Sequence, residues 1–195
     1  MTVQCEDEIS GCASAVGASF AGALAVTSTS GPGICLKSEA MNLAVIMELP
    51  LVVLDVQRGG PATGLPTKSE QTDLLQVLFG RNGESPMPVL AATSPTDCFE
   101  CAYMASKIAL EHMTPVVLLT DAFVANGSAA WKLPKLADYP VSFRLMYAPK
   151  CSSWTPYQRD ERPAAAIGPS PGTEASPTSS ADWRKTTRQA PSLPT

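Results

Sequence analysis

The hydrophobic pattern divides the chain into short apolar runs separated by longer segments with helical periodicity. The apolar runs predict strands at residues 24–29, 51–56, 88–92 and 115–121, and residues 1–6 are consistent with the end of one more short strand. The run LVVLDV at 51–56 is typical of a strand that is covered on both faces of a parallel sheet. The pattern therefore predicts a buried sheet.

Helices are expected between these strands, over residues 7–23, 34–49, 69–79 and 94–112. The last of them starts at SPTD (94–97), which offers an N-cap serine, a proline at the first helical position and an acid at the third. The segment 34–49 is apolar almost all the way round. We therefore expect it to be buried on more than one side, within the domain or against a partner.

The alternation of strands and helices predicts the fold class and the domain organisation. We expect an α/β fold over residues 1–140, with a doubly wound parallel sheet in a three-layer α/β/α arrangement. From residue 134 onward the chain holds ten of its eighteen prolines and few large aliphatic residues. Composition alone predicts that residues 141–195 form an irregular, disordered extension.

Four segments are expected to meet at one edge of this sheet, because ligands of such folds bind at the carboxyl ends of the strands. They are the helix start at Glu8, the SGPG turn at 30–33, the glycine- and proline-rich loop that carries Arg58, and the segment 121–128. We expect Gly31 and Gly33 to adopt backbone angles that other residues avoid. This convergence is the physical argument for a site.

Three acids, Glu6, Asp7 and Glu8, precede a segment that is nearly free of charge. The simple interpretation is that they complement the positive end of the helix dipole. A sharper hypothesis is that one of them faces a ligand across a subunit boundary. Lys37 and Asp73 are interpreted as structural residues.

Composition and charge exclude several classes of partner. The 195 residues carry a formal net charge of −4, which argues against nucleic acid and against an anionic membrane as partners. No apolar run reaches the roughly 18 residues of a membrane span, and the first residues lack the features of a signal peptide, so we expect a cytoplasmic protein. Cys98 and Cys101 form a CxxC, but His112 is the only histidine, so we interpret both cysteines as structural and expect no metal site.

The chain resembles known proteins at two levels, and each resemblance rests on particular residues. A glutamate that opens a small-residue helix, a glycine nine positions later (Glu8 and Gly17), a strand and a GPG loop resemble the pyrimidine-binding domain of thiamine-diphosphate enzymes. The stretches 17–40, 55–74 and 97–128 are similar to the alpha subunit of 2-oxoacid:ferredoxin oxidoreductases, and the 2-oxoglutarate type is the nearest. The resemblance covers roughly residues 5–140.

The resemblance implies a role for each candidate residue. In this family the glutamate at the position of Glu8 hydrogen-bonds the aminopyrimidine N1′ of thiamine diphosphate and so promotes loss of the thiazolium C2 proton. The alternative is that Glu8 only complements the positive end of the helix dipole. Ser30, Gly31 and Pro32 would shape the cofactor pocket. Arg58 matches the arginine that grips the substrate carboxylate, although a solvated loop arginine is the alternative.

The resemblance also implies partners and a reaction. A beta subunit would hold the diphosphate through Mg²⁺ and carry an iron–sulfur cluster, so neither metal is expected on this chain. The complete complex would oxidise a 2-oxoacid with coenzyme A to acyl-CoA, CO₂ and reduced ferredoxin. Alternatives are a pyruvate- or branched-chain-specific relative, a non-catalytic assembly subunit, and a flavodoxin-like nucleotide module, which lacks its GxGxxG motif here.

Two departures from the family pattern stand out. The family's alpha subunit begins earlier, with a strand–helix segment that is missing here, so the chain is interpreted as a fragment. In the tail, family landmarks at 153–161 and 171–174 alternate with stretches that do not match. A shifted reading frame explains such a pattern, for example at ADWRK (181–185). Our hypothesis is that much of residues 141–195 is out-of-frame translation.

Overall fold

The core of the protein is a four-stranded parallel sheet in the order β1-β2-β4-β3. The computed structural model describes residues 1–140, 147–148 and 168–169. The strands of the sheet are β1 (Ala25–Thr29), β2 (Leu51–Gln57), β3 (Val89–Ala91) and β4 (Pro115–Asp121). A separate parallel pair joins β5 (Tyr147–Ala148) to β6 (Gly168–Pro169).

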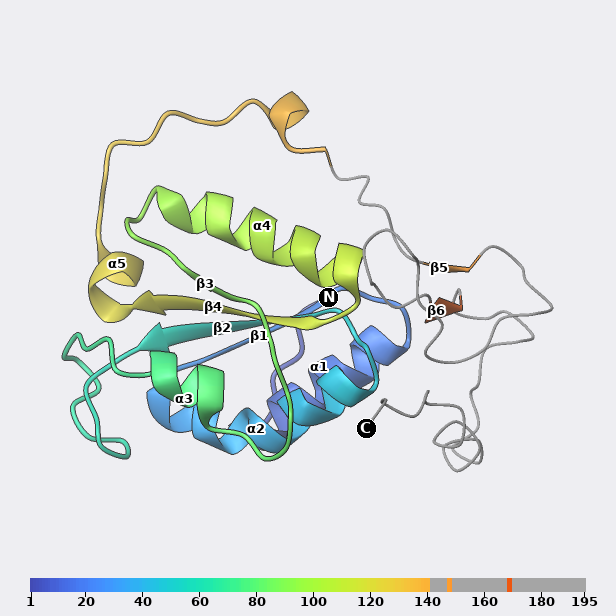
Figure 1. Ribbon diagram of the computed structural model, residues 1–195. Helices are drawn as coiled ribbons and strands as arrows, with labels where there is room; N and C mark the ends of the chain where they lie inside the picture. Colours follow the sequence, from blue (N-terminus) through green and yellow to red (C-terminus); the bar gives the residue numbers. More distant parts are fainter. Residues whose placement is uncertain (141–146, 149–167, 170–195) are drawn as a thin grey trace, which may run out of the picture.

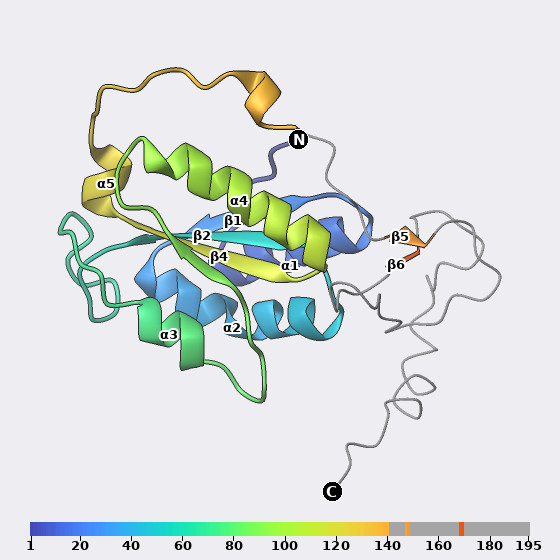
Figure 2. The same ribbon diagram turned by 45° about the horizontal axis from the view of Figure 1, so that its top comes forward.

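Helices cover both faces of the sheet and make three layers (Figures 1 and 2). One side, here called the α2 face, carries α1, α2 and α3, and the other, the α4 face, carries α4. The helices are α1 (Glu8–Phe20), α2 (Gly31–Ile46), α3 (Leu74–Phe79), α4 (Asp97–His112) and α5 (Ala122–Asn126), followed by a short 3₁₀ turn η1 (Leu136–Asp138). Of the described helices, none is long and apolar enough to cross a membrane.

The alternation of side chains along β2 explains how the two faces are filled. Leu51 and Val53 point to the α2 face and belong to the larger core cluster, together with residues of α1 and α2. Val52 points the other way and packs with Ala105 and Ala109 of α4. Both faces of β2 and β4 are thus buried, as predicted for a parallel sheet.

Several expected elements differ from the observed ones. The helices expected over 7–23, 34–49 and 69–79 are observed as Glu8–Phe20, Gly31–Ile46 and Leu74–Phe79. Residues 1–6 form no strand, so the described sheet has four strands rather than five. The SGPG segment is not a turn before a helix, because α2 already begins at Gly31 with Ser30 as its N-cap. At α4 the N-cap is Thr96 rather than Ser94, whose hydroxyl instead accepts a hydrogen bond from the Asp97 N–H at 3.2 Å. The expectations for the tail lie outside the described residues, apart from the two short strands.

Candidate functional site

The three N-terminal acids have different roles in the structure. Asp7 is the N-cap of α1: its side chain accepts a hydrogen bond from the Ser10 N–H at 2.7 Å, and the Asp7 N–H donates to the Ser10 hydroxyl at 3.3 Å. The bond from the Ser10 N–H lowers the pKa of Asp7. This reciprocal capping box completes the helix start without Glu8. Glu8, the first helical residue, keeps an exposed side chain.

Glu8 reaches the sheet by passing over Gly33 of α2. A Cβ atom built at Gly33 would lie 2.8 Å from Glu8 Cγ and 3.3 Å from Glu8 Oε1, and it would overlap the Thr29 hydroxyl. Thr29 is the last residue of β1. The first turn of α2 therefore has no room for a side chain at this position, and the space belongs to Glu8 and Thr29.

Gly31 provides a second close approach on the same turn. A Cβ there would lie 2.8 Å and 3.0 Å from the two carboxyl oxygens of Asp73. The expected reason for these glycines is wrong, because both 31 and 33 are helical, and the described glycines with positive φ are Gly22, Gly64 and Gly83. Contact with neighbouring side chains, rather than backbone freedom, explains glycine at both positions.

The remaining predicted cofactor residues also lie on this turn. Ser30 caps α2 with its backbone only, because its side chain makes no capping hydrogen bond. Pro32 follows in the first turn, where a missing N–H leaves no helical bond unmade. The structure thus gathers Glu8 and the SGPG segment at the carboxyl end of β1.

Arg58 begins the long loop that follows β2. The residue is half-buried, and its Nε is buried without a hydrogen-bond partner among the described residues. The loop is held by its own hydrogen bonds, from the Gly59 N–H to the Lys68 carbonyl at 2.8 Å and from the Gly60 N–H to the Glu70 carboxylate at 2.7 Å. Arg58 therefore stands at the carboxyl end of β2 with donor capacity unused.

The same loop returns to the end of β4. The Gln71 side-chain amide donates to Asp121 at 2.5 Å, and Asp121 also caps α5 by accepting from the Phe123 and Val124 N–H groups at 2.7 Å and 2.9 Å. Burial alone would raise the pKa of Asp121, but these three donors outweigh it and lower that pKa. The predicted convergence of the 58 loop and the 121–128 segment is therefore seen at Gln71 and Asp121.

A row of polar residues on the α2 face connects these segments, and the sequence analysis missed it. Thr29 of β1 stands in register with Asp55 of β2, which is fully buried. Two residues on, the Gln57 side chain accepts from the Asp73 N–H at 3.0 Å and donates to the Thr120 carbonyl at 3.3 Å. The available signal was strand alternation, since 51, 53, 55 and 57 share one face.

Lys37 lies behind Glu8 inside the fold. It is 1% exposed, and its ammonium group donates to the Thr27 hydroxyl at 2.7 Å. Burial lowers the pKa of Lys37, and the charge of the nearby Glu8 carboxylate opposes this effect. A buried cation therefore borders the helix that presents Glu8.

The cysteines and the acids form no metal centre in the part of the chain that the structure describes. Cys98 and Cys101 are free thiols on α4, and their sulfur atoms lie 3.5 Å and 3.9 Å from backbone carbonyls. Among the described residues, no group of three or more His, Cys, Asp or Glu side chains could hold a metal ion.

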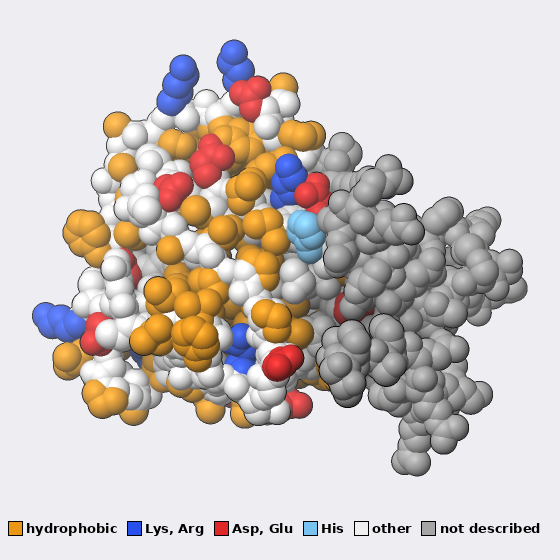
Figure 3. Space-filling view, in the orientation of Figure 1, with side chains coloured by type: hydrophobic (Ala, Val, Ile, Leu, Met, Phe, Trp, Pro, Cys, Tyr) orange, Lys and Arg blue, Asp and Glu red, His pale blue; other side chains and the backbone are white. Residues whose placement is uncertain are grey.

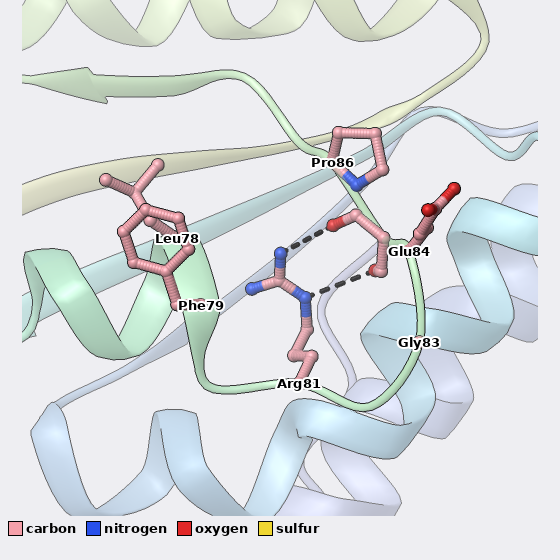
Figure 4. Close-up of a pocket in the computed structure, with 7 residues that line it drawn as sticks. Leu78, Phe79, Arg81, Gly83, Glu84 and Pro86 are labelled. Atoms are coloured by element: carbon pink, nitrogen blue, oxygen red, sulfur yellow. Dashed lines mark hydrogen bonds between the residues drawn. The ribbon is translucent and has the colours of Figure 1, made fainter.

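A hollow of about 420 Å³ lies on the loop between α3 and β3, with Leu78, Phe79 and Pro86 in its lining (Figure 4). Arg81 also lines it, but the guanidinium donates to the Ser85 hydroxyl at 3.2 Å, to the Ser85 carbonyl at 2.6 Å and to the Val77 carbonyl. Burial lowers the pKa of Arg81. Because two of these acceptors belong to Ser85 in the same loop and the third to Val77 of α3, Arg81 closes the loop onto α3, and we do not assign the ligand site here.

Comparison with known proteins identifies relatives of the chain. The sequence matches the family described as "Pyruvate flavodoxin/ferredoxin oxidoreductase, thiamine diP-bdg" over residues 1–188. It is 56% identical over 173 residues to "2-oxoglutarate oxidoreductase subunit KorA" of Mycobacterium tuberculosis, which is 89% of this chain and 26% of that relative. It is 43% identical over 136 residues to "2-oxoglutarate synthase subunit KorA" of Archaeoglobus fulgidus, covering 70% and 39%. The chain thus spans well under half the length of these relatives.

A solved structure is similar as well. It is the 2-oxoglutarate:ferredoxin oxidoreductase from Magnetococcus marinus with 2-oxoglutarate, coenzyme A and succinyl-CoA bound. The TM-score is 0.79 at 37% identity, over 89% of this chain and 30% of that chain. The expected α/β fold and the resemblance drawn from the sequence are both confirmed.

The close approach at Gly33 can be tested by stability. We expect Gly33→Ala to lower the free energy of unfolding by about 1–3 kcal/mol, because the new methyl group must displace Thr29 or Glu8. The matched control is Gly17→Ala in α1, where nothing lies within 4 Å of an added Cβ. That change should raise stability by about 0.5–1 kcal/mol. Urea unfolding of the two variants measures both effects.

A second substitution distinguishes crowding of the new methyl group at position 33 from a general intolerance of α2 to substitution. On the Gly33→Ala background, Thr29→Ala removes the hydroxyl that the methyl group meets, so the two changes should be less costly together than the sum of their separate effects. Equal responses to alanine at 17 and 33, or strict additivity of the pair, would show that the contact is not the reason for glycine.

Proposed function

We propose that this chain supplies the pyrimidine half of a thiamine-diphosphate site. The chain belongs to the pyruvate flavodoxin/ferredoxin oxidoreductase family and matches its thiamine-diphosphate-binding region. The chain would act as the alpha subunit, or part of it, of a 2-oxoacid:ferredoxin oxidoreductase. The observation that carries the proposal is the exposed Glu8 side chain, held over Gly33 at the carboxyl edge of the sheet.

The reaction we propose is the oxidative decarboxylation of 2-oxoglutarate. The 2-oxoacid would lose CO₂, its acyl carbon would be joined to the thiol of coenzyme A, and two electrons would pass to ferredoxin. The names of the two relatives and the ligands of the Magnetococcus marinus protein favour 2-oxoglutarate over pyruvate or a branched-chain 2-oxoacid. Thiamine diphosphate, when bound, supplies the carbanion chemistry.

Glu8 would hold and move one proton at N1′ of the cofactor's aminopyrimidine. The arrangement fits that group, because the Glu8 stem is fixed against Gly33 while its side chain is open to a ligand. Asp7 already supplies the cap of α1, so Glu8 is not needed for it. A positioned carboxyl group of this kind is a suitable general acid–base.

Arg58 would bind a carboxylate of the 2-oxoacid, and the SGPG segment would shape the wall of the pocket between Glu8 and Arg58. A half-buried arginine whose Nε has no partner among the described residues retains donors for two parallel hydrogen bonds. We assign Ser30, Gly31 and Pro32 to the cofactor side of this pocket.

A beta subunit would complete the site, holding the diphosphate through Mg²⁺ and carrying the iron–sulfur cluster. Support for a partner comes from the surface of α3, where Leu74, Leu75, Leu78 and Phe79 are 46%, 67%, 39% and 77% exposed. Figure 3 shows hydrophobic side chains gathered over this part of the molecule. An apolar cluster of this kind marks a protein contact more often than a free surface.

Glu8→Gln tests the catalytic assignment in the chain co-expressed with its beta subunit. The amide keeps the shape of the side chain but cannot exchange a proton, so we expect kcat for 2-oxoglutarate oxidation to fall by about 100-fold or more. Glu6→Gln, two residues away and also exposed, is the matched control and should change kcat little. Full activity of Glu8→Gln would refute the assignment. A complex that assembles but is inactive even with the native sequence would favour an assembly subunit.

Arg58→Lys tests the substrate contact. Lysine keeps the charge and loses the paired geometry of the guanidinium, so we expect KM for the 2-oxoacid to rise about 10- to 100-fold. The KM for coenzyme A serves as the internal control and should stay within about twofold, since Arg58 is assigned to the other substrate. If both KM values rise together, or neither changes, Arg58 does not bind the 2-oxoacid.

A further inference from the structure

Asp55 is a fully buried acid without a conventional partner. It is 0% exposed on the α2 face of β2, and neither carboxyl oxygen has a hydrogen-bond donor among the described residues. Its neighbours on the same face of the strand are Val53 and Gln57. A buried carboxylate left unpaired in this way would be strongly destabilising. The side chain therefore requires a proton or a partner.

Asp73 is the acidic side chain that interacts with Asp55. The backbone N–H of Asp73 is fixed by the Gln57 side chain at 3.0 Å, and its carboxyl group packs against Gly31 at the start of α2. Asp73 Oδ2 is itself buried without a donor. Asp73 is the N-cap residue of α3, yet its side chain makes no capping bond. The carboxyl group thus does not cap its own helix and lies instead against the first turn of α2.

Two buried carboxylates side by side repel each other, whereas one proton between them makes a hydrogen bond. Burial, the charge of Asp73 and the hydrogen bond between the two side chains raise the pKa of Asp55 to about 8. The pKa of Asp73 is also raised, by burial above all, and the hydrogen bond with Asp55 opposes this rise without cancelling it. Asp55 is fully buried whereas Asp73 is only half-buried, so we assign the proton to Asp55, with Asp73 as acceptor.

We propose that Asp55 and Asp73 share one proton, and that this carboxyl pair fixes the start of α3 and the end of the Arg58 loop against the first turn of α2. The pair joins β2 to the segment before α3, and Asp73 in turn contacts Gly31, two residues from the glycine beneath Glu8. Asp55 and Asp73 are thus positioning residues for the site. This last role rests on the proposed function, whereas the shared proton does not.

Other charged groups surround the pair without neutralising it. Lys37 on α2 is engaged with Thr27, and Asp121 on β4 is satisfied by Gln71 and the start of α5. Glu70 disfavours ionisation of Asp73. The titratable and charged side chains described on the elements around this edge are Glu8 on α1, Lys37 on α2, Arg58, Lys68 and Glu70 in the loop, and Asp121 on β4.

A shared proton makes stability depend on pH in a defined direction. Unfolded Asp55 titrates near 3.8 and folded Asp55 at about 8, so between these values the folded state holds one proton more. Stability from this group is therefore fully present below about pH 4 and is lost as pH rises toward 8. A difference of one bound proton between the folded and unfolded states lowers Tm by on the order of 3 °C for each unit rise in pH, for a chain of this size.

Asp55→Asn tests this directly in the full chain. The amide resembles the protonated acid in shape and can donate to Asp73, so the fall in Tm between pH 6 and 8 should become smaller by about that amount per pH unit. Asp73→Asn should have the same effect, because its amide can donate to an ionised Asp55. Asp97→Asn is the control. Hydrogen bonds from Thr93 lower the pKa of Asp97, so its removal should leave the slope between pH 6 and 8 unchanged.

Infrared spectroscopy keeps the proposal testable if a variant folds poorly. The native chain at pH 7 should show the band of a protonated carboxylic acid, and Asp97→Asn should retain it. The band should be missing from whichever of Asp55→Asn or Asp73→Asn folds. An unchanged slope in both variants, or no such band in the native chain, would overturn the shared proton. The shared proton would also be overturned if Mg²⁺ stabilised the native chain at pH 8 and Asp55→Asn abolished that effect. Such a result would show a cation between the carboxylates.

The positioning role has its own measurement in the assembled complex. Above pH 8 the pair loses its proton, so kcat of the native complex should fall there, and Asp55→Asn should move that alkaline limb up by about one pH unit or more. An alkaline limb that does not move overturns the positioning role even where the infrared band is present. A complex without activity at any pH refutes the proposed function. The shared proton is then tested by the stability and infrared measurements alone.

Discussion

The architecture of the site depends on how closely three helices approach the carboxyl end of the sheet. At the first turn of α2, Gly33 lets the side chains of Glu8 and Thr29 approach the helix closely, and Gly31 lets the Asp73 carboxyl group do so. A methyl group at either glycine would occupy space that the side chain of Glu8, Thr29 or Asp73 already fills. One turn of helix thus brings together groups from α1, β1, β2 and the start of α3.

The residues buried on the α2 face of the sheet change from apolar to polar along the strands. Toward the amino ends of the strands the face is apolar, with Leu51, Val53 and Val117 in the main core cluster. Toward the carboxyl ends it becomes polar at Asp55, Gln57 and Asp121, all of them buried. Buried polar groups are costly unless they are paired, so this edge is held in one arrangement by the few donors available. Rigidity where the cofactor would lie is the expected consequence.

Much of the fold could be predicted from the sequence. The apolar runs located the four strands of the sheet to within one residue or so, because short hydrophobic segments between glycines and prolines have few alternatives. The helix near 69–79 is shorter than expected, and α3 begins at Leu74 since the preceding residues are used in loop hydrogen bonds. The edge at which Glu8 and Arg58 lie followed from topology alone.

The site was predictable only in part, for a physical reason. Glu8 was distinguished from Asp7 by its spacing to Gly17, and the capping box of Asp7 fits that distinction. Asp55 was overlooked because it stands within an apolar run, and its partner lies eighteen positions away, across a loop whose path no local pattern determines. The purpose of Gly31 and Gly33 was likewise misjudged, because contact between distant side chains leaves no periodic signal.

The central claim is that Glu8 is half of an active site whose other half lies on another chain. A crystal structure of the assembled complex with thiamine diphosphate and a 2-oxoacid bound tests it most directly. The claim predicts a Glu8 carboxyl oxygen at a hydrogen-bond distance, about 2.6–3.2 Å, from a ring nitrogen of the aminopyrimidine, with Gly33 still in contact with the Glu8 stem. A pyrimidine ring bound by a carboxylate of the partner, with Glu8 turned to solvent, would contradict it.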